Sequence, residues 1–369
     1  MTLNPAHPLG PEFLAEVQAR LDCFFDAQDL FLNFRRDSFS DAGHCVDLMW
    51  DQARQCASGG KRIRPGFCYW TYVGVSGETE LDPGVMDIAA SLDLLHAFAL
   101  VHDDLIDGSD FRRGNPSTHR FFGEVHSQQE WLGDGGHFGT SSAILVGDLL
   151  FAWSVSMVEQ AKIAPEKLSR ARPFLEAVRT EVLAGQFLDL VIEAKPLDPS
   201  TMIEDATMVM EFKTSKYTVT RPMLIGAGLA GASQATIEAL NSFGFSIGRA
   251  FQMRDDLLGI FGDSAVMGKP SGDDIRSGKK TVVIGEALRK ASSEDGSRLI
   301  QMLGDPSLTE SDIDQARTIL VECGAVESTE TMIRENAVAG CRYLEDLPLS
   351  AEGRQALMGL VQASVERDA

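Results

Sequence analysis

Three carboxylates gather in the sequence VHDDLIDG, at Asp103, Asp104 and Asp107. The apolar run before them contains no glycine or proline, so we expect a helix that continues to Ile106 and breaks at Gly108. On that helix the three like charges crowd the C-terminal end, where they oppose the helix dipole. Local stability does not explain this crowding, so we expect a cation to bind there. The possible ligands here are carboxylate oxygens, with no cysteine among them. Such a set favours Mg²⁺, which usually bridges carboxylates to substrate phosphates.

Two arginines, Arg112 and Arg113, follow these carboxylates after a short polar loop. For the DDxxD pattern alone, a solvated acidic helix end would be the simpler interpretation. A guanidinium pair beside metal-binding carboxylates is a natural site for a polyphosphate, because each guanidinium presents several N–H donors to phosphate oxygens. We therefore expect this segment to bind a metal ion together with a polyphosphate group.

A basic turn precedes this segment in the sequence SGGKRIRPG. Gly59 and Gly60 permit a tight turn, and Lys61 and Arg64 follow at the start of another expected helix, where backbone N–H groups also favour an anion. A surface cluster of basic residues is the alternative interpretation, but such a cluster stands out in so acidic a protein. His96 lies about two turns before the carboxylates, and only its position suggests a role.

A second acidic helix end occurs in FQMRDDLLGIFGD, where Asp255 and Asp256 repeat the earlier pattern. The loop that follows, GKPSGDDIRSGKKT, contains several lysines, among them Lys269 and Lys279. A further lysine, Lys213, lies in EFKTSKYTVTRP. The sequence therefore has two acidic helix ends, and each is followed by a basic loop.

The composition limits the possible classes of protein. A net charge of -21 argues against general binding to nucleic acid or to an anionic membrane. The six cysteines show no CxxC pairing and are expected to be reduced thiols of a cytoplasmic protein. The N-terminal sequence has no signal-peptide pattern, and the longest apolar run, residues 143–158, is broken by Asp148 and is too short to span a bilayer. We expect no membrane span.

Almost every segment has the period of a helix, and the alternation of strands is hard to find. The expected helices cover residues 11–34, 42–57, 82–107, 138–161, 170–194, 241–261 and most of 282–369. Residues 108–139 are expected to form a long loop that could close over a site. The sequence GAGLAG matches a dinucleotide fingerprint, but no strand precedes it, so its glycines are interpreted as sites of close helix packing. An all-α bundle in one domain, residues 1–369, is the simplest architecture, because facing helices can direct carboxylates into a common cavity.

Five ordered motifs resemble the trans-isoprenyl diphosphate synthases, the polyprenyl synthetase family. These motifs are GGKRIRP, LLHAFALVHDDLID, RRGNPSTH, FQMRDD and GKP…GKKT, and they span nearly the whole chain. The resemblance implies an isoprenoid synthase-type helical bundle, usually a homodimer, with aspartate-rich motifs at residues 103–107 and 255–259 facing a central cavity. It also implies a prenyltransferase that joins isopentenyl diphosphate head-to-tail to an allylic diphosphate of C5 to C15.

The resemblance assigns roles position by position. Mg²⁺, about three ions per active site with substrate bound, would be held by Asp103, Asp104, Asp107 and Asp255. The allylic diphosphate would contact Arg112, Lys213, Lys269 and Lys279, and isopentenyl diphosphate would contact Lys61, Arg64, His96 and Arg113. Thr214 and Gln252 would direct oxygens toward the allylic cation, and Gln186 would line the metal side. No side chain is an obvious base for the final proton loss, which the resemblance assigns to the departing diphosphate.

Two positions bear on variation within the family. Gly259 stands where most relatives have the third aspartate of the second motif, and Asp263, one turn further along, could compensate. Phe98 lies five residues before Asp103, and with the small Ala99 it would form a floor under the growing chain. A bulky Phe98 without an insertion in DDLID resembles the geranylgeranyl type and favours a C20 product. Ordinary core packing of Phe98 is an alternative, and so is a synthase of longer or shorter chains.

Two other functions compete with chain elongation. A class I terpene cyclase also ionises a diphosphate at DDxxD, but the region 241–261 lacks the Asn, Ser and Glu metal ligands of that class. Gly259 raises the alternative of a non-catalytic partner subunit, yet the first motif, Arg112, Lys213 and the loop lysines are intact.

Overall fold

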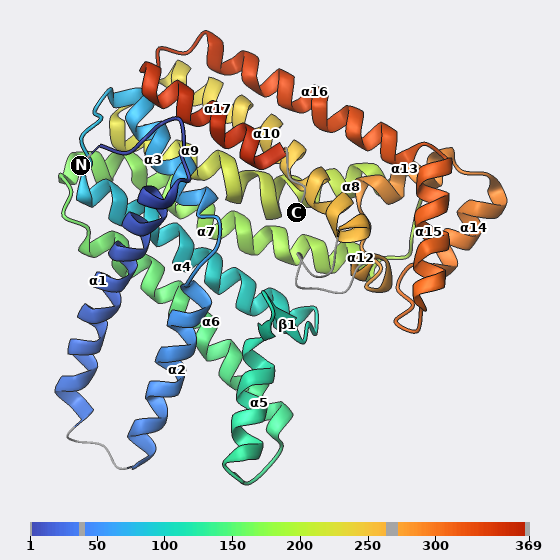
Figure 1. The fold of residues 1–369 in the computed structure, drawn as a ribbon, viewed down its shortest axis with the longest axis horizontal. Coiled ribbons are helices and arrows are strands. Elements are labelled where there is room, and N and C mark those ends of the chain that lie inside the picture. Colours follow the sequence, from blue (N-terminus) through green and yellow to red (C-terminus); the bar gives the residue numbers. More distant parts are fainter. Residues whose placement is uncertain (1, 37–40, 263–271, 366–369) are drawn as a thin grey trace. The chain divides into compact units, whose positions relative to one another are not determined.

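The computed structural model describes residues 2–36, 41–262 and 272–365. Within these ranges the chain is helical apart from turns and one ribbon of two short strands, β1 (Phe111–Arg112) and β2 (Asn115–Pro116), which pair antiparallel (Figure 1). The prediction of an all-α fold is therefore confirmed.

The chain forms two compact units, each built from separate segments of sequence. The first unit comprises Met1–Arg172, Ile225–Gly231 and Ser350–Leu357, and the second comprises Pro173–Leu224, Ala232–Leu349 and Met358–Ala369. The expectation of a single domain over residues 1–369 stays a prediction.

In the first unit the helices up to Gln160 follow the sequence pattern, except that the sequence did not predict the helix over residues 118–128. They are α1 (Pro11–Arg36), α2 (Asp41–Ala57), α3 (Ile63–Ser76), α4 (Pro83–Ile106), α5 (Thr118–Gln128) and α6 (Gly135–Gln160). Helix α4 packs against α1, α3 and α6, and α5 packs on α6. The core around α4 includes Phe67, Leu94 and Val146, all fully buried.

The two ends of α4 are set by local chemistry. At its start Asp82 accepts hydrogen bonds from the backbone N–H groups of Gly84 and Val85 at 2.9 and 3.3 Å, and Pro83 begins the first turn. At its end Gly108 adopts a positive φ of 65°, which glycine reaches without strain. The helix therefore ends at Ile106 and the chain turns at Gly108, as predicted.

Residues 108–139 do not form a long loop, so that prediction was wrong. The strands β1 and β2 and the helix α5 lie within this segment. Two histidines of this segment have polar contacts: His126 is buried, and its Nε2 lies 3.3 Å from the carbonyl oxygen of Leu132, while Nδ1 of His119 lies 3.2 Å from Oγ of Ser117. The aromatic ring of His126 also packs against Phe138, which supplies the apolar contact that holds α5 on α6.

Two of the three glycines of GAGLAG, Gly226 and Gly228, allow close helix packing, as predicted, whereas Gly231 lies just after the helix with a φ of 80°. A Cβ added at Gly226 would overlap the carbonyl oxygen of Cys68, and one added at Gly228 would lie 2.9 Å from the carbonyl oxygen of Arg170. Gly226 and Gly228 belong to α9 (Arg221–Ala230), and Gly226 brings its backbone against the helix that carries Cys68.

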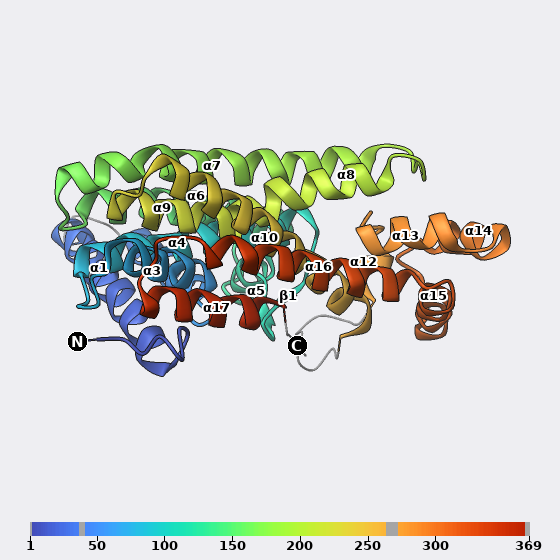
Figure 2. The ribbon, with the colours of Figure 1, turned by 90° about the horizontal axis from the view of Figure 1, so that it is seen from above.

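The second unit surrounds a long helix, α10 (Gln234–Phe261). Its other elements are most of α7 (Pro165–Ala194), α8 (Met202–Val209), the π-helix η1 (Met210–Thr220), α12 (Asp273–Arg276), α13 (Val282–Lys290), α14 (Ser293–Met302), α15 (Glu310–Glu322), α16 (Ala325–Glu345) and the end of α17 (Ala351–Val365). Helix α10 packs along α16 and η1, and Figure 2 shows α10 and α16 side by side. Its apolar face joins a buried core that includes Ile260, Ile275 and Ile333.

Two helices, α4 and α6, are long and apolar enough to cross a membrane by length and composition. In α4, 78% of the apolar window is buried inside the protein, as in a core helix, and in α6 the share is 44%. Two such helices among the described residues are weak evidence for a membrane span, and they do not indicate a membrane protein.

Candidate active site

The middle carboxylate of the first acidic motif is bound to an arginine. Asp104 is buried and accepts hydrogen bonds from Nε of Arg112 at 2.9 and 3.1 Å and from Nη2 of the same guanidinium. Burial lowers the pKa of Arg112, but the hydrogen bond and charge of Asp104, with the charges of Asp103 and Asp107, outweigh it and raise this pKa. Asp103 is half-buried and Asp107 is exposed, so they are the more accessible carboxylates of the motif.

The next arginine lies over the basic turn. Nη1 of Arg113 donates a hydrogen bond of 3.0 Å to the carbonyl oxygen of Ser58. A Cβ added at Gly60 would lie only 2.9 Å from Nη2 of Arg113, so a larger residue at this position would move the guanidinium. Gly60 also has a φ of 87°, which glycine tolerates best. The structure thus joins the RRG and GGKR motifs, which are separate in the sequence.

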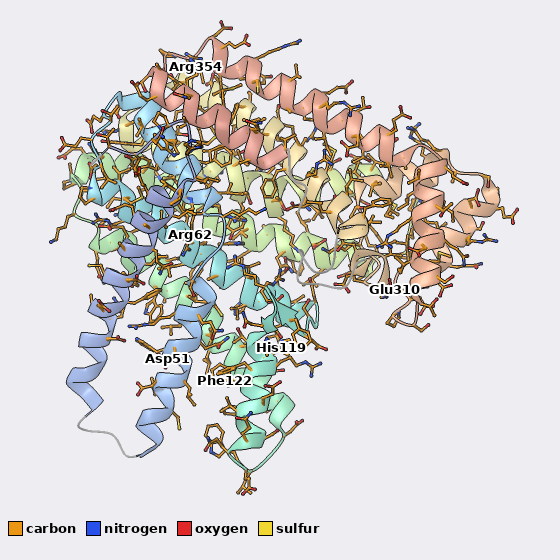
Figure 3. The ribbon with its side chains drawn as sticks, in the orientation of Figure 1. Asp51, Arg62, His119, Phe122, Glu310 and Arg354 are labelled. Carbon is orange, nitrogen blue, oxygen red and sulfur yellow. The ribbon has the colours of Figure 1, made fainter. Side chains whose placement is uncertain are left out.

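A buried ion pair fixes the start of α3. Arg62, at the helix N-cap with a φ of 51°, donates hydrogen bonds to Oδ2 of Asp93 at 2.8 Å, to the carbonyl oxygen of Ala57 at 3.0 Å and to Oε1 of Gln18 at 2.7 Å. Figure 3 shows Arg62 at this helix start. Because a buried charge that loses its partner is costly, this pair fixes the backbone on either side of Arg62, where Lys61 and Arg64 lie.

The sequence did not reveal the role of Arg62. The available signal was a third cation in GGKRIRP together with an acidic residue, Asp93, inside the apolar run of α4. An aspartate in an otherwise apolar helix needs a partner, although the sequence alone does not say which one.

His96 is half-buried among arginines. Burial lowers its pKa well below the ordinary value, and the positive charges of Arg64, Arg113, Arg112 and Arg62 lower it further. The imidazole is therefore neutral at pH 7 and can donate or accept a hydrogen bond without adding charge. Of the predicted basic residues, Arg64, Arg112 and Arg113 are thus close enough for their charges to act on His96.

A cavity of about 300 Å³ lies within the first unit beside these groups. Both arginines of the RRG motif, Arg112 and Arg113, line it together with Asp104 and Gly59. The wall also contains side chains that the sequence did not single out: Gln52, Gln55, Cys56 and Thr118. Burial raises the pKa of the Cys56 thiol, so that cysteine is a neutral hydrogen-bonding group and not a nucleophile. A cavity lined by two guanidinium groups suits an anionic ligand.

The expected floor residue is held by aromatic contacts. Phe98 is 5% exposed, and its ring meets the rings of His102 and Phe151 edge-on at centroid distances of 4.9 and 5.1 Å. The His102 ring fills the space that a Cβ at Gly147 would need, which brings α4 and α6 close together. Ala99 is half-buried beside Phe98. The packing of these rings fixes the rotamer of Phe98.

In the second unit Lys213 lies in the π-helix η1. Its Nζ is 2.7 Å from Oδ2 of Asp189, which comes from α7. A Cβ added at Gly185 would lie 2.6 Å from the Cα of Lys213, so α7 and η1 are in close contact. Thr214 follows in the same wide turn, and Gln186 lies on α7 beside Gly185. π-helical turns are rare and often occur at functional sites.

The second acidic motif lies near the end of α10. Nε2 of Gln252 donates a hydrogen bond of 2.7 Å to Oδ1 of the buried Asp256, which fixes the orientation of the amide. Burial, with the nearby charges of Asp274 and Asp255, raises the pKa of Asp256 to about 7. Asp255 is half-buried. The preceding residue, Arg254, anchors this turn through hydrogen bonds of 2.5 and 2.8 Å to Glu330 on α16.

The lysines of the loop after the second acidic motif differ in their contacts. Lys269 and Asp263 lie outside the described residues. Nζ of Lys279 lies 3.1 Å from Oδ1 of Asp274. Lys280 instead caps the C-terminus of α7, because its Nζ donates hydrogen bonds of 2.6 Å to the carbonyl oxygens of Ile192 and Lys195.

Among the described residues, no group of three His, Cys, Asp or Glu side chains forms a complete metal site. Mg²⁺ is commonly held by one or two carboxylates plus substrate phosphates, so an incomplete set is expected for it. Asp103 and Asp107, one turn apart at the end of α4, supply the oxygen donors that a hard cation prefers. The residues present therefore fit Mg²⁺, with a diphosphate supplying further ligands.

Comparison with known proteins identifies the family. The polyprenyl synthetase family profile matches residues 48–320, and the chain belongs to this family. Geranylgeranyl diphosphate synthase of Mycobacterium tuberculosis is 30% identical over 333 residues, covering 89% of this chain and 87% of that protein. Geranylfarnesyl diphosphate synthase of Aeropyrum pernix is 31% identical, covering 84% of this chain and 91% of that protein.

The solved structures agree with this assignment. Geranylgeranyl pyrophosphate synthase of Corynebacterium glutamicum, in complex with isoprenyl diphosphate and magnesium, is 38% identical to this chain, with a TM-score of 0.87. The match covers 96% of this chain and 99% of that one. The protein is a prenyltransferase of the trans-prenyl chain-elongating type.

The neutral state of His96 predicts a pH dependence of stability. The unfolded chain binds a proton at this histidine below about pH 6.5, whereas the folded protein does not, so the free energy of unfolding should fall as the pH drops below that value. We expect His96→Gln to reduce the slope of the free energy of unfolding against pH by up to about 1.4 kcal/mol per pH unit. The free energy is measured by urea unfolding between about pH 7.5 and 5.5. The exposed His137, changed to Gln, is the control, and equal slopes in both variants would contradict a neutral His96.

Proposed function

We propose that the protein joins isopentenyl diphosphate to allylic diphosphates of C5 to C15 and releases mainly geranylgeranyl diphosphate, the C20 product. The observation that carries this proposal is the cavity of the first unit, where Arg112 and Arg113 lie directly beside the first acidic motif. The similarity to the C. glutamicum and M. tuberculosis relatives supports the choice of substrates and product.

The first unit supplies most of the binding groups in this proposal. Asp103 and Asp107 hold Mg²⁺, and Asp104 contributes by keeping Arg112 in place, with its remaining N–H donors directed to the allylic diphosphate. Arg113, with Lys61, Arg64 and His96, binds isopentenyl diphosphate. Because His96 is neutral, it orients that diphosphate by a hydrogen bond and leaves the charge to the arginines and the lysine.

The second unit supplies the remaining groups. Asp255 contributes to metal binding, and Lys213, Lys269 and Lys279 bind the allylic diphosphate. Thr214 and Gln252 direct oxygens toward the allylic cation; the hydrogen bond from the Gln252 amide nitrogen to Asp256 leaves its carbonyl oxygen available for that task. Gln186 lines the metal side, near the contact of Asp189 with Lys213.

The reaction needs charge neutralisation more than acid–base catalysis. The allylic C–O bond breaks, and the diphosphate leaves with the electron pair. When bound, Mg²⁺ neutralises the charge that develops on this leaving group. The lysines and arginines stabilise the same charge through fixed hydrogen bonds, which are strong where water is excluded. The double bond of isopentenyl diphosphate then attacks the cation, and the departing diphosphate accepts the proton that is lost.

The product length follows from the floor beneath the first motif. Phe98 and its partners His102 and Phe151 form a rigid aromatic group five residues before Asp103. A bulky residue at this distance limits the growing chain, which favours C20. Longer products are the alternative, and the resemblance to the geranylfarnesyl diphosphate synthase of A. pernix favours testing for C25.

We further propose a homodimer, about three Mg²⁺ ions per active site with substrate bound, and a cytoplasmic location. The dimer and the ions rest on the family resemblance. The location is supported by six free cysteines, which suit a reducing compartment.

The proposed reaction is tested with purified protein, Mg²⁺, isopentenyl diphosphate and each allylic diphosphate from C5 to C15. We expect C20 diphosphate as the main product by mass spectrometry. Asp103→Asn should lower the rate at least about hundredfold, because the leaving group loses part of its metal binding. Asp110→Asn is the control, since Asp110 is an exposed acid that pairs with Arg120. Full activity of Asp103→Asn would exclude the metal assignment.

The contact between Gly60 and Arg113 predicts that a substitution at Gly60 changes KM for one substrate only. In Gly60→Ala the added Cβ displaces the Arg113 guanidinium, so KM for isopentenyl diphosphate should rise at least about tenfold, the size expected for a lost charged hydrogen bond. Gly59→Ala is a matched control, because Gly59 also has a positive φ (70°) but its Cβ would approach Arg113 only to 4.0 Å. Equal effects of the two variants would show that backbone strain, and not Arg113, is responsible.

The floor assignment predicts that Phe98→Ala lengthens the product beyond C20. Removing the ring opens space below the first motif, and the chain can add further isoprene units before it is released. Product lengths are measured by mass spectrometry, with Phe122→Ala on α5 as a control that removes another buried ring. An unchanged distribution for Phe98→Ala would mean that Phe98 is ordinary core.

A further inference from the structure

The segment that carries Lys213 and Thr214 has an unusual backbone. η1 is a π-helix of eleven residues, whereas π-helical segments in proteins are mostly single turns. At its end the backbone N–H of Arg221 donates a hydrogen bond to the carbonyl oxygen of Lys216, five residues earlier. Pro222 follows, and in an α-helix its ring would crowd the carbonyl group four residues before it. Because long π-helices are rare, we looked for contacts outside the backbone that favour this one.

Three charged side chains at η1 are spaced by five residues: Glu211, Lys216 and Arg221. Oε1 of Glu211 lies 3.2 Å from Nζ of Lys216. In an α-helix, residues five apart point about 140° away from each other around the axis, whereas the i→i+5 bonds of a π-helix bring them to neighbouring positions on successive turns. The ion pair between Glu211 and Lys216 therefore fits the π-helix, and an α-helix would separate its partners.

One carboxylate of α7, that of Glu181, joins the last two of these charges. It accepts two hydrogen bonds of 2.6 Å from Arg221, one from Nε and one from Nη2. Its Oε1 also lies 3.7 Å from Nζ of Lys216. A two-point contact between a guanidinium and a carboxylate sets orientation as well as distance. Glu181 thus binds both cations where residues five apart lie on one side of the helix, which is the π-helical arrangement.

A second helix, α10, packs closely on η1. A Cβ added at Gly248 would overlap Oγ of Ser215, and one added at Gly244 would lie 2.7 Å from Oγ1 of Thr220. Oγ of Ser215 donates hydrogen bonds of 3.3 Å to the carbonyl oxygens of Gly244 and Phe245. This packing limits how far η1 can move as a whole, and the charges on α7 then favour the way in which it is wound.

We propose that Glu181, with its partners Lys216 and Arg221, is a positioning residue for prenyl transfer: it keeps η1 wound as a π-helix and so fixes where Lys213 and Thr214 lie. The inference rests on the proposed function, in which Lys213 binds the allylic diphosphate and Thr214 directs an oxygen toward the allylic cation. In this role Glu181 acts through η1 and touches no substrate.

The competing explanation is that these ion pairs only attach α7 to η1. Loss of Glu181 would then lower thermal stability, and the protein that stays folded would react at the normal rate. The spacing of the cations favours the positioning role, because attachment alone could use cations at any spacing, whereas the contacts of Glu181 with both Lys216 and Arg221 need the π-helical one.

The test compares the steady-state kinetics of Glu181→Gln with each substrate. We expect kcat/KM for the allylic diphosphate to fall at least about tenfold, because displacement of a binding group by about 1 Å can cost up to about a hundredfold. KM for isopentenyl diphosphate should stay within about twofold, because its proposed contacts lie in the first unit. Glu286→Gln on α13 is the control, since Glu286 is also a partly buried carboxylate paired with an arginine, Arg289 at 2.7 Å.

Two further variants separate positioning from attachment. Lys216→Gln removes the middle charge of the five-residue spacing and should lower kcat/KM for the allylic diphosphate in the same selective way. Glu181→Gln combined with Lys213→Ala should be within about threefold of Lys213→Ala alone, because Glu181 acts through the position of that lysine. Independent action of the two residues would instead multiply their separate effects.

Thermal unfolding of each variant, followed by circular dichroism, identifies any that are not folded, and Lys216→Gln carries the test if Glu181→Gln does not fold. If the unaltered protein forms no prenyl diphosphate, the proposed function fails and the inference fails with it. If it is active and the folded variants keep their kcat/KM for the allylic diphosphate, only the inference is overturned. Equal losses for both substrates, or multiplied effects with Lys213→Ala, would also overturn it. A loss confined to the allylic substrate, with no multiplied effect in the double variant, supports it.

Discussion

The bond between Arg112 and Asp104 is the interaction on which the first site depends. A protein with a net charge of -21 repels anions at long range, so positive charge must be fixed where a diphosphate binds. The buried carboxylate of Asp104 holds the guanidinium of Arg112 at the end of α4. This pairing also reduces the repulsion within the acidic motif and leaves Asp103 and Asp107 as its accessible carboxylates. Arg113, the next residue, then reaches the basic turn at Ser58.

Close approaches at glycines position several of the polar side chains. Arg113 lies against Gly60, His102 against Gly147, and Asp274 against Gly259. At Gly147 and Gly259 the side chain occupies the volume of an absent Cβ, and at Gly60 a guanidinium nitrogen would lie only 2.9 Å from one. A helical glycine costs about 1 kcal/mol relative to alanine, and the close packing that Gly147 and Gly259 permit offsets this cost.

The helices were predictable because their signals are local. Apolar spacing, the cap at Asp82 and the break at Gly108 lie within a few residues of the ends that they determine. The segment 108–139 was predicted wrongly because its polar composition hid α5. This helix is stabilised by tertiary packing, in which its Phe122 contacts Phe138 of α6. Composition identifies a polar segment, but it does not show whether a neighbouring helix will cover its few apolar side chains.

The sequence by itself determined the helical class, the order of the motifs, the family and the chemistry that carboxylates, lysines and arginines can perform. Only the tertiary structure decided which of these groups act together: Asp104 binds Arg112, Arg62 pairs with Asp93, and Lys280 caps a helix. The reason is physical. Helix period and capping depend on neighbours in the chain, whereas ion pairing and burial depend on which distant residues share a space from which water is excluded. Asp274 shows this difference most clearly, since its relation to Gly259 exists only in three dimensions.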